Sequence, residues 1–377
     1  MNVTSQPDNP RGRLVLVTVS GPDAPGITAE LTAILAQAQV TVLDLGQAVI
    51  HGLLSLSLLY DPGQTDEKST VKDLLFKAAE LGLKLDFQVI DKRKLGDQQA
   101  KEKFHYALTL IGDSLTARVL HEVTACLTKH DCNIDFIQRL SQDEFSCVEL
   151  LVGSQDEVSK RKLGLELLQI ARRNSVDIAL QSDGLFRRSK RLVVMDMDST
   201  LIQNEVIDEF ARQLGVYEEV ARITHEAMKG KLDFDQALQL RCEKLKGLTL
   251  KDVDDVYHRL ELTQGAEDLC RVLKKLGYRL ALISGGFQLI ADRFRDRLGM
   301  DFAYANTLEF QGGVATGRVI PPIVNAQRKA DLLQVIAQQE RILLDQVIAV
   351  GDGANDLLML EKAGLGIAFN AKPLVRE

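Results

Sequence analysis

The chain has 377 residues, of which 45% are hydrophobic and 26% charged, and its formal net charge is −7. That length exceeds one typical domain, so we expect two or three. The acidic balance argues against a nucleic-acid partner, and no apolar run approaches the roughly 20 residues that span a bilayer.

The N-terminus and the cysteines indicate a cytoplasmic location. Residues 1–12 are polar, contain Pro7 and Pro10, and lack the apolar core of a secretory signal. Five cysteines without a CxxC pair suit free, buried thiols in a reducing compartment. They are Cys126, Cys132, Cys147, Cys242 and Cys270.

Residues 13–181 contain an internal repeat. The pattern of the first copy predicts strand, helix, strand, strand, helix and strand at 13–20, 28–38, 40–48, 53–60, 71–81 and 85–90. The second copy repeats that order at 105–111, 115–129, 133–140, 144–153, 158–173 and 176–181. Such a βαββαβ order, found twice, predicts two ferredoxin-like domains, at 12–92 and 103–183.

Both repeats resemble ACT domains, which are small amino-acid-sensing modules. The first has Gly21-Pro22-Asp23-Ala24-Pro25-Gly26-Ile27 between its first strand and helix, at the loop that often lines the family's ligand site. The second has Gly112-Asp113-Ser114-Leu115 there and lacks Pro-Gly. The resemblance implies an amino-acid effector and a homodimer. The alternative is that both repeats serve only in oligomerisation or as spacers.

Two charged segments are predicted to be linkers. The first is Asp91 to Glu102, between the repeats. The second is Gln181 to Lys190, which leads into the remaining part of the chain and contains Arg187 and Arg188.

An apolar run, Val193 to Met195, ends in two aspartates, Asp196 and Asp198. Residues i and i+2 of a strand point the same way, so two carboxylates converge at the strand's end. A helix expected from Leu201 to Gly215 would bring backbone N–H groups near them. Two acids beside a helix terminus suit a cation with a phosphate. The alternative is a pair of N-cap aspartates on a surface turn.

The same theme returns twice later in the chain. The apolar strand predicted at 278–284 ends in Ser284-Gly285-Gly286, and the one at 346–352 leads into Gly351-Asp352-Gly353-Ala354-Asn355-Asp356. Lys329 opens a helical stretch after two prolines. Further strands at 191–196, 302–306 and 364–369 alternate with helices, which predicts an α/β fold with a doubly wound parallel sheet. We also expect a hairpin at 308–320 and a helical cap at about 203–265.

Four motifs carry a resemblance to a known family: the aspartate pair Asp196 and Asp198, then Ser284, then Lys329, then the run from Gly351 to Asp356. In this order they resemble the haloacid dehalogenase superfamily of phosphotransferases, over residues 190 to 370. The resemblance implies a phosphatase domain at 190–377, with Asp196 as nucleophile and Asp198 as proton donor and acceptor. It implies Mg²⁺ held by the Asp196 carboxylate, the Asp198 backbone carbonyl and Asp352, with Asp356 in the outer shell. Phosphoryl oxygens would be held by Ser284, Gly285 and Lys329, and Asn355 would orient substrate or Lys329.

The cap resembles that of superfamily members that hydrolyse O-phospho-L-serine. It places Glu205 against the substrate ammonium and Arg241 against its carboxylate, with Met228 and Phe234 as an apolar wall. The implied function is Mg²⁺-dependent hydrolysis through an aspartyl-phosphate, the last step of L-serine biosynthesis, with L-serine acting at the ACT-like repeats. The alternative functions are a phosphatase of another small phosphorylated amino acid or metabolite, or an amino-acid-sensing regulatory protein. Mn²⁺ in place of Mg²⁺ is the alternative for the metal.

One departure from the family pattern lies at the C-terminus. Family members usually continue past the segment that matches Lys372-Pro373-Leu374 with another strand and helix, whereas this sequence stops at Glu377. Either the chain is truncated or the sheet lacks its last edge.

Overall fold

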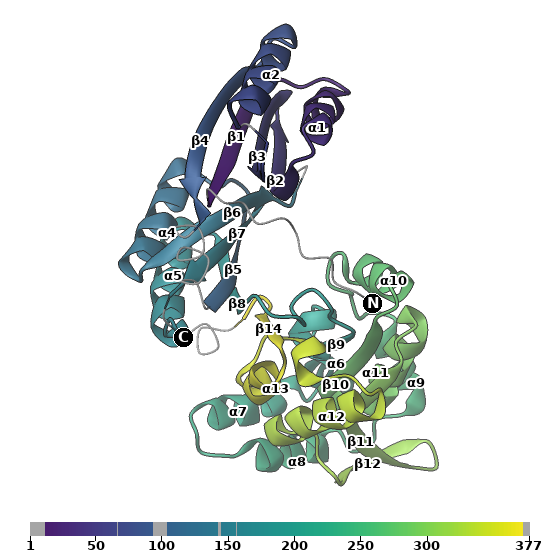
Figure 1. The fold of residues 1–377 in the computed structure, drawn as a ribbon. Coiled ribbons are helices and arrows are strands. Elements are labelled where there is room, and N and C mark those ends of the chain that lie inside the picture. Colours follow the sequence, from purple (N-terminus) through teal and green to yellow (C-terminus); the bar gives the residue numbers. More distant parts are fainter. Residues whose placement is uncertain (1–11, 66, 93–103, 142–144, 156, 372–377) are drawn as a thin grey trace. The chain divides into compact units, whose positions relative to one another are not determined.

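The computed structural model of the chain describes residues 12–65, 67–92, 104–141, 145–155 and 157–371 (Figure 1). It divides into two compact units, Met1–Leu180 and Gln181–Glu377, and each is described by itself. Most of the linker predicted at Asp91 to Glu102, the polar N-terminus and the C-terminal departure lie outside the described residues. Among the residues described, no helix is long and apolar enough to cross a membrane.

The first repeat forms a four-stranded antiparallel sheet with strand order β2-β3-β1-β4. Its elements are β1 (Arg13–Pro22), α1 (Ile27–Gln37), β2 (Thr41–Ile50), β3 (Leu53–Asp61), α2 (Glu67–Glu80) and β4 (Lys84–Asp91). Val15, Val17 and Val19 alternate along β1 and are buried with Leu31 and Leu35 of α1, so one face of the sheet is covered by helices. Every residue of the edge strand β2 is exposed.

The second repeat has the same order of elements and the equivalent sheet, β6-β7-β5-β8. Its elements are β5 (Phe104–Gly112), α4 (Ala117–Lys129), β6 (Cys132–Arg139), β7 (Ser146–Ser154), α5 (Lys160–Asn174) and β8 (Asp177–Ser182). Both helices contribute to one core, with Val123 and Leu127 from α4 and Leu163 and Leu167 from α5. The predicted pair of ferredoxin-like βαββαβ folds is therefore confirmed.

The C-terminal unit is built on a six-stranded sheet with strand order β12-β11-β10-β9-β13-β14. The strands are β9 (Leu192–Met195), β10 (Arg279–Phe287), β11 (Phe302–Gln311), β12 (Val314–Ile320), β13 (Val347–Gly351) and β14 (Leu365–Ala368). All neighbours pair in parallel except β11 and β12, which form the expected hairpin. Gly312 and Gly313 connect them with positive φ angles, which glycine adopts without strain.

Strand β9 lies at the centre of this sheet and is buried on both faces. Val193 and Met195 belong to one core cluster, and Leu192 and Val194 belong to the other. The first cluster includes α11 (Gln288–Leu298) and the second includes α12 (Ala326–Gln339). The chain continues to β10 and β11 on one side of β9 and returns to β13 and β14 on the other. A reversal of this kind opens a crevice at the carboxyl ends of the strands.

Four helices separate β9 from α10 (Ala266–Lys275) and occupy the region predicted as a cap. They are α6 (Val206–Leu214), α7 (Tyr217–Met228), α8 (Phe234–Lys244) and α9 (Leu250–Tyr257).

The start of the helix predicted at Leu201 to Gly215 is wrong. Residues Met197–Leu201 form a kinked turn in which Ser199 has a φ of 55°, and the regular helix begins only at Val206. The helix begins at Val206 because the N–H of this residue donates to the Asp198 Oδ1 at 2.9 Å. The helix N-terminus therefore contacts Asp198 of the acidic pair, but after a turn rather than immediately.

Candidate active site

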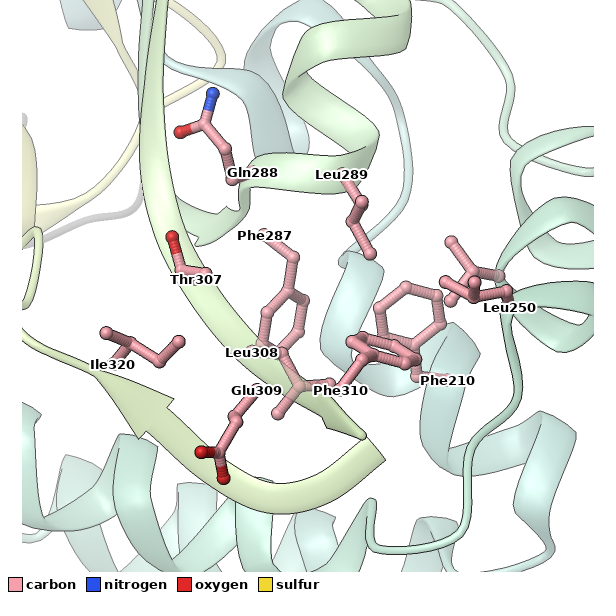
Figure 2. Close-up of a pocket in the computed structure, with 11 residues that line it drawn as sticks. Phe210, Leu250, Phe287, Gln288, Leu289, Thr307, Leu308, Glu309, Phe310 and Ile320 are labelled. Carbon is pink, nitrogen blue, oxygen red and sulfur yellow. The ribbon is translucent and has the colours of Figure 1, made fainter. Parts of the chain in front are cut away.

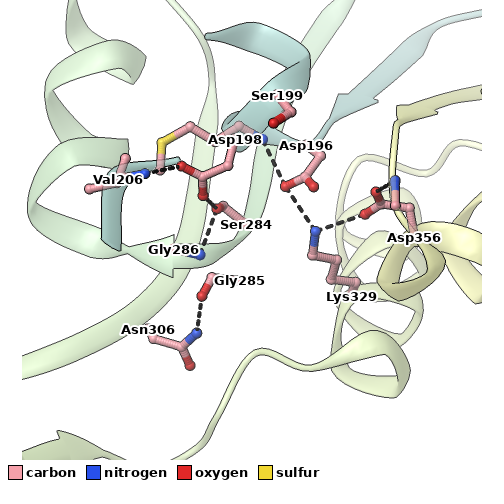
Figure 3. A network of polar contacts seen from close by, with 12 residues as sticks. Asp196, Asp198, Ser199, Val206, Ser284, Gly285, Gly286, Asn306, Lys329 and Asp356 are labelled. Atoms are coloured by element: carbon pink, nitrogen blue, oxygen red, sulfur yellow. Dashed lines mark hydrogen bonds and ion pairs between the residues drawn. The ribbon is translucent and has the colours of Figure 1, made fainter. Parts of the chain in front are cut away.

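Asp196 follows β9 directly and is almost completely buried (Figure 3). Its Oδ1 accepts a hydrogen bond from the Met197 N–H at 2.7 Å and lies 2.8 Å from the Nζ of Lys329. Burial raises the pKa of Asp196 well above its usual value, although the Lys329 charge opposes this effect. The ammonium group next to Asp196 therefore favours the charged carboxylate that a nucleophile needs.

Lys329 and Asp356 complete a buried ionic group. Lys329 lies in the first turn of α12, and its Nζ is 2.7 Å from the Oδ1 of Asp356. The Asp356 Oδ2 accepts from the Gly353 N–H at 3.0 Å. Burial opposes the charge on Lys329, but Asp196 and Asp356 outweigh burial and raise its pKa. Both carboxylates therefore share one fixed cation.

Asp198 is held by two hydrogen-bond donors. Besides the Val206 N–H, the Ser284 hydroxyl donates to its Oδ2 at 3.3 Å, and the Ser284 oxygen in turn accepts from the Gly286 N–H at 2.8 Å. Burial raises the pKa of Asp198 to about 7, and the nearby Glu205 carboxylate adds to the effect. A carboxyl with a pKa near neutrality can both give and accept a proton.

Two glycines, Gly286 after Ser284 and Gly351 before Asp352, leave room for acidic side chains. A Cβ on Gly286 would lie 2.6 Å from the Asp198 Oδ2, and one on Gly351 would lie 2.5 Å from the Asp356 Cγ. Real Cβ atoms do not approach so closely, so a side chain at either position would displace a carboxylate. Gly286 and Gly351 thus leave room for the protein's own acidic side chains.

Three buried carboxylates form a cluster that we call the acidic trio: Asp196, Asp352 and Asp356. One oxygen from each lies within 4.8 Å of the others. Three anions against one lysine leave an excess of negative charge, which suits a hard divalent cation with oxygen ligands. The Asp198 backbone carbonyl follows Asp196 closely in the chain, as the predicted ligand set requires.

A cavity of about 800 Å³ opens beside these groups. Nine of the predicted site residues line it: Asp196, Asp198, Glu205, Met228, Phe234, Arg241, Gly285, Asp352 and Asn355. Ser284 and Lys329 are not among its lining residues, and both are fully buried. Met228 lines it yet is 80% exposed, so in this structure Met228 does not form the water-excluding wall that was expected.

The cap side of the cavity carries the pair predicted to bind a zwitterion. The Oε1 of Glu205 accepts from the Ser199 hydroxyl at 3.0 Å, and the Arg241 Nε donates to the Ala237 carbonyl at 3.3 Å. Burial lowers the pKa of Arg241, while Glu205 and Asp208 are among the anions that oppose this. The Arg241 guanidinium therefore stays charged next to the carboxylates.

Sequence reasoning missed two polar residues of the site. Asp208 of α6 lines the cavity, and burial raises its pKa against the influence of Arg212 and Arg241. Asn306 of β11 is fully buried, donates to the Gly285 carbonyl at 2.8 Å and accepts from the Val324 N–H at 2.7 Å. Asp208 could have been found from its position three residues after Glu205, which is one turn along a helix. A lone asparagine such as Asn306 gives no comparable signal.

A second, smaller cavity of about 290 Å³ lies under the β11–β12 hairpin (Figure 2). Its lining is mainly apolar and includes Phe210, Leu308 and Phe310. Phe287 lines both cavities. Because Glu309 is the only charged residue in its lining, this cavity lacks the groups that phosphoryl chemistry needs.

Comparison with known proteins agrees with this geometry. The pattern of the haloacid dehalogenase-like hydrolase family matches residues 190–364, and ACT domain patterns match 13–88 and 105–181. A phosphoserine phosphatase from Streptomyces coelicolor is 43% identical over 96% of this chain and 87% of its own length. One from Mycobacterium tuberculosis is 40% identical over 96% and 88%.

A solved structure supports the fold. A haloacid dehalogenase family hydrolase from Salmonella enterica serovar Typhi superimposes with a TM-score of 0.63, at 29% identity, over 72% of this chain and 91% of its own. The fold and the acidic trio thus define a haloacid dehalogenase-like hydrolase. Within that class, the chain belongs to the phosphoserine phosphatase family, with two ACT domains ahead of the hydrolase domain.

Proposed function

We propose that the chain hydrolyses O-phospho-L-serine to L-serine and inorganic phosphate, the last step of L-serine biosynthesis. One observation carries the proposal. The buried Asp196 and the partly buried Asp198 line the same cavity as Glu205 and Arg241. A phosphorylated amino acid needs both sets of groups, since its phosphate must meet a nucleophile while its ammonium and carboxylate meet an anion and a cation. Arginine offers a carboxylate a planar, two-pronged donor.

In the proposed first step, Asp196 attacks phosphorus while the bond from phosphorus to the serine oxygen breaks. Asp198 gives its proton to that oxygen, and an aspartyl-phosphate forms on Asp196. In the second step, Asp198 removes a proton from a water molecule, which attacks phosphorus and releases phosphate from Asp196. The pKa of about 7 at Asp198 supports both of its roles.

Charge on the phosphoryl group would be stabilised by fixed donors. Lys329 lies 2.8 Å from the nucleophile, and the Ser284 hydroxyl and the Gly285 N–H lie at the end of β10. Such donors act where transition-state charge develops. Asn355 lines the cavity beside them and would orient substrate or Lys329.

The acidic trio fits Mg²⁺, which when bound would supply positive charge against the phosphate. We assign the Asp196 carboxylate, the Asp198 backbone carbonyl and Asp352 as its ligands. Asp356 is assigned to the outer shell, because its two oxygens already accept from Lys329 and Gly353. Titration of the metal-free protein with Mg²⁺ and Mn²⁺ would decide between the two ions.

The test is phosphate release from O-phospho-L-serine, O-phospho-L-threonine and p-nitrophenyl phosphate, each with Mg²⁺ and with EDTA. We expect strong preference for phosphoserine and loss of activity in EDTA. Equal rates on all three would retain the phosphatase chemistry and reject the zwitterion site. Preference for phosphothreonine would favour a phosphatase of another small phosphorylated amino acid.

We further infer that L-serine regulates the enzyme through its ACT domains, whose ranges we place at 12–92 and 103–183. Inhibition kinetics with L-serine test this. Non-competitive inhibition would support a separate effector site, whereas purely competitive inhibition would place serine only in the catalytic cavity, as a product, and reject regulation.

A homodimer is also proposed, supported by the exposed apolar residues of β2, which include Leu43, Leu45 and Val49. An edge strand with free backbone groups and apolar side chains favours pairing with another copy. Sedimentation of the full chain would show a monomer if this is wrong.

A further inference from the structure

A cluster of metal-ligating side chains lies in the second repeat, apart from the catalytic groups. Cys126 belongs to the last turn of α4, His130 caps the end of that helix, and Glu166 lies on the neighbouring α5. Cys126 and His130 are four residues apart, so they lie on the same side of one helix. The three donor atoms all lie within 4.8 Å of one another.

The separations approach those of a tetrahedral site. The Cys126 Sγ lies 3.9 Å from the Glu166 Oε2, and the His130 Nε2 lies 3.3 Å from the Glu166 Oε1. Ligands bound to Zn²⁺ at about 2.0–2.3 Å in tetrahedral geometry stand about 3.3–3.7 Å apart. The nitrogen and oxygen thus already have a suitable spacing, and the sulfur lies within 4.8 Å of both donor atoms.

His130 strengthens the case for a ligand. Its Nε2 is buried and lies 3.3 Å from the Glu166 Oε1, in a geometry that falls short of a regular hydrogen bond. A bound cation would satisfy this nitrogen and the carboxylate together.

The cluster is reachable from solvent. Cys126 and Glu166 line an open cleft of about 550 Å³, together with His121, Lys129 and Arg173. A fourth coordination position would therefore face water. Three protein ligands with one open position are a common arrangement for zinc.

Lys129 is the competitor for this position. Its Nζ lies 2.9 Å and 3.0 Å from the two Glu166 oxygens, and its side chain is largely exposed. An exposed lysine side chain can turn away at small cost, because surface ion pairs contribute little.

We propose that Cys126, His130 and Glu166 bind a Zn²⁺ ion in the second ACT domain. Binding replaces the Lys129 ammonium at Glu166, and the Cys126 thiol gives its proton to solvent as the Zn–S bond forms. A thiolate, an imidazole and a carboxylate are the ligand types that zinc takes. The acidic trio of the C-terminal unit has oxygen donors only, so the two sites select different metals.

The test uses Co²⁺ as a spectroscopic probe of the full-length protein freed of metal. A thiolate-to-cobalt charge-transfer band in the near ultraviolet reports a sulfur ligand, and the acidic trio cannot produce one. We expect this band at about one equivalent of Co²⁺, and we expect Zn²⁺ to displace it. No band in the wild type, or a band that needs a large excess of Co²⁺, would overturn the proposal.

Matched variants locate the ligands. Cys126→Ser should remove the band, and Glu166→Gln, a partly exposed change that should leave folding intact, should weaken Co²⁺ binding more than about 100-fold. Cys132→Ser and Cys147→Ser are controls in the same domain and should keep the band. Loss of the band in Cys132→Ser with retention in Cys126→Ser would reject the assignment, as would unchanged affinity in Glu166→Gln.

A gain of affinity provides an independent check. Lys129→Ala removes the competing cation and should tighten Co²⁺ binding by about two- to fivefold. Weaker binding in this variant would show that Lys129 supports the site rather than competing for it. Phosphate release should be unchanged in all of these variants, so this test does not depend on the proposed function.

Discussion

At the scale of single residues, charge balance around Lys329 organises the site. Asp196, Lys329 and Asp356 are all buried, and one ammonium contacts both carboxylates. A buried charge that loses its partner is strongly unfavourable. Lys329 therefore has two effects: it fixes the position of the Asp196 carboxylate and it makes burial of two anions tolerable.

Replacing Lys329 by methionine should lower the free energy of unfolding by about 3–5 kcal/mol, because two carboxylates lose their counter-charge. Urea titration in EDTA, followed by circular dichroism, measures this. The double variant Lys329→Met/Asp356→Asn removes one of the two anions and should recover part of the loss. No recovery would mean that packing, and not charge, accounts for the effect.

Asp196→Asn should abolish phosphate release while leaving the melting temperature within a few degrees of wild type. The amide keeps the shape of the side chain but is a poor nucleophile. Phosphate release under saturating phosphoserine is the measurement. Activity within a few fold of wild type would reject Asp196 as the nucleophile.

Arg241→Ala should reduce kcat/KM for phosphoserine by about 10- to 100-fold, the worth of a lost charged hydrogen bond. Hydrolysis of p-nitrophenyl phosphate, which has no carboxylate, should change little. Arg241→Lys is the matched control, since it keeps the charge but loses the planar fork and should show an intermediate defect. Equal losses on both substrates would argue against carboxylate recognition.

At the scale of elements, Asp301 ties α10 to the start of β10. Its carboxylate accepts from Lys274 at 2.7 Å, from the Leu280 N–H at 2.8 Å and from Arg279 at 2.7 Å. Burial opposes ionisation, but these donors outweigh it and lower the pKa of Asp301. The strand that carries Ser284 is thereby anchored at its opposite end.

Because the folded-state pKa of Asp301 is lowered, its stabilisation is present above the unfolded carboxyl pKa of about 3.9 and is lost as pH falls through the folded value. Asp301→Asn should therefore cost about 1–3 kcal/mol near pH 7, and the gap to wild type should narrow below about pH 4. Urea unfolding over this pH range measures the difference in free energy of unfolding.

Asp296→Asn is the control, because Asp296 is in an exposed ion pair with Arg295. It should cost below about 0.5 kcal/mol at every pH. A pH-independent difference for Asp301→Asn would contradict the argument.

The elements also show which parts of the site can be predicted from the sequence. Asp196, Ser284 and Asp352 could be placed together because parallel strands end at one edge of a sheet, and the apolar strands before them are unambiguous. The turn at Ser199 could not be predicted, because Leu201 and Ile202 continue an apolar pattern that suits a helix. Its cause is a hydrogen bond from Val206 to the Asp198 side chain, which no local periodicity encodes. Nor does sequence spacing reveal that Ser284 and Lys329 are fully buried.

At the scale of the whole molecule, the chain divides into two compact units. Separate cores predict that the units unfold in separate transitions. Mg²⁺ should raise the melting temperature of the C-terminal unit alone. At a Mg²⁺ concentration of 100 times its Kd, the free energy of unfolding of that unit should rise by up to about 2.7 kcal/mol. Calorimetry with and without Mg²⁺ tests this, with Asp352→Asn as the control that should not respond. A shift of both transitions in wild type would show that the two units are coupled.

The central position of β9 also determines the order in which the molecule can be completed during synthesis. The strand that delivers Asp196 leaves the ribosome before both of its neighbours, and β13 begins only at Val347. At 5–20 residues per second, that strand waits on the order of ten seconds for its second partner. The two ACT domains, whose last strand ends at Ser182, are fully synthesised well before then. A nascent chain therefore carries two finished ACT domains while the strand that precedes Asp196 still lacks its second neighbour.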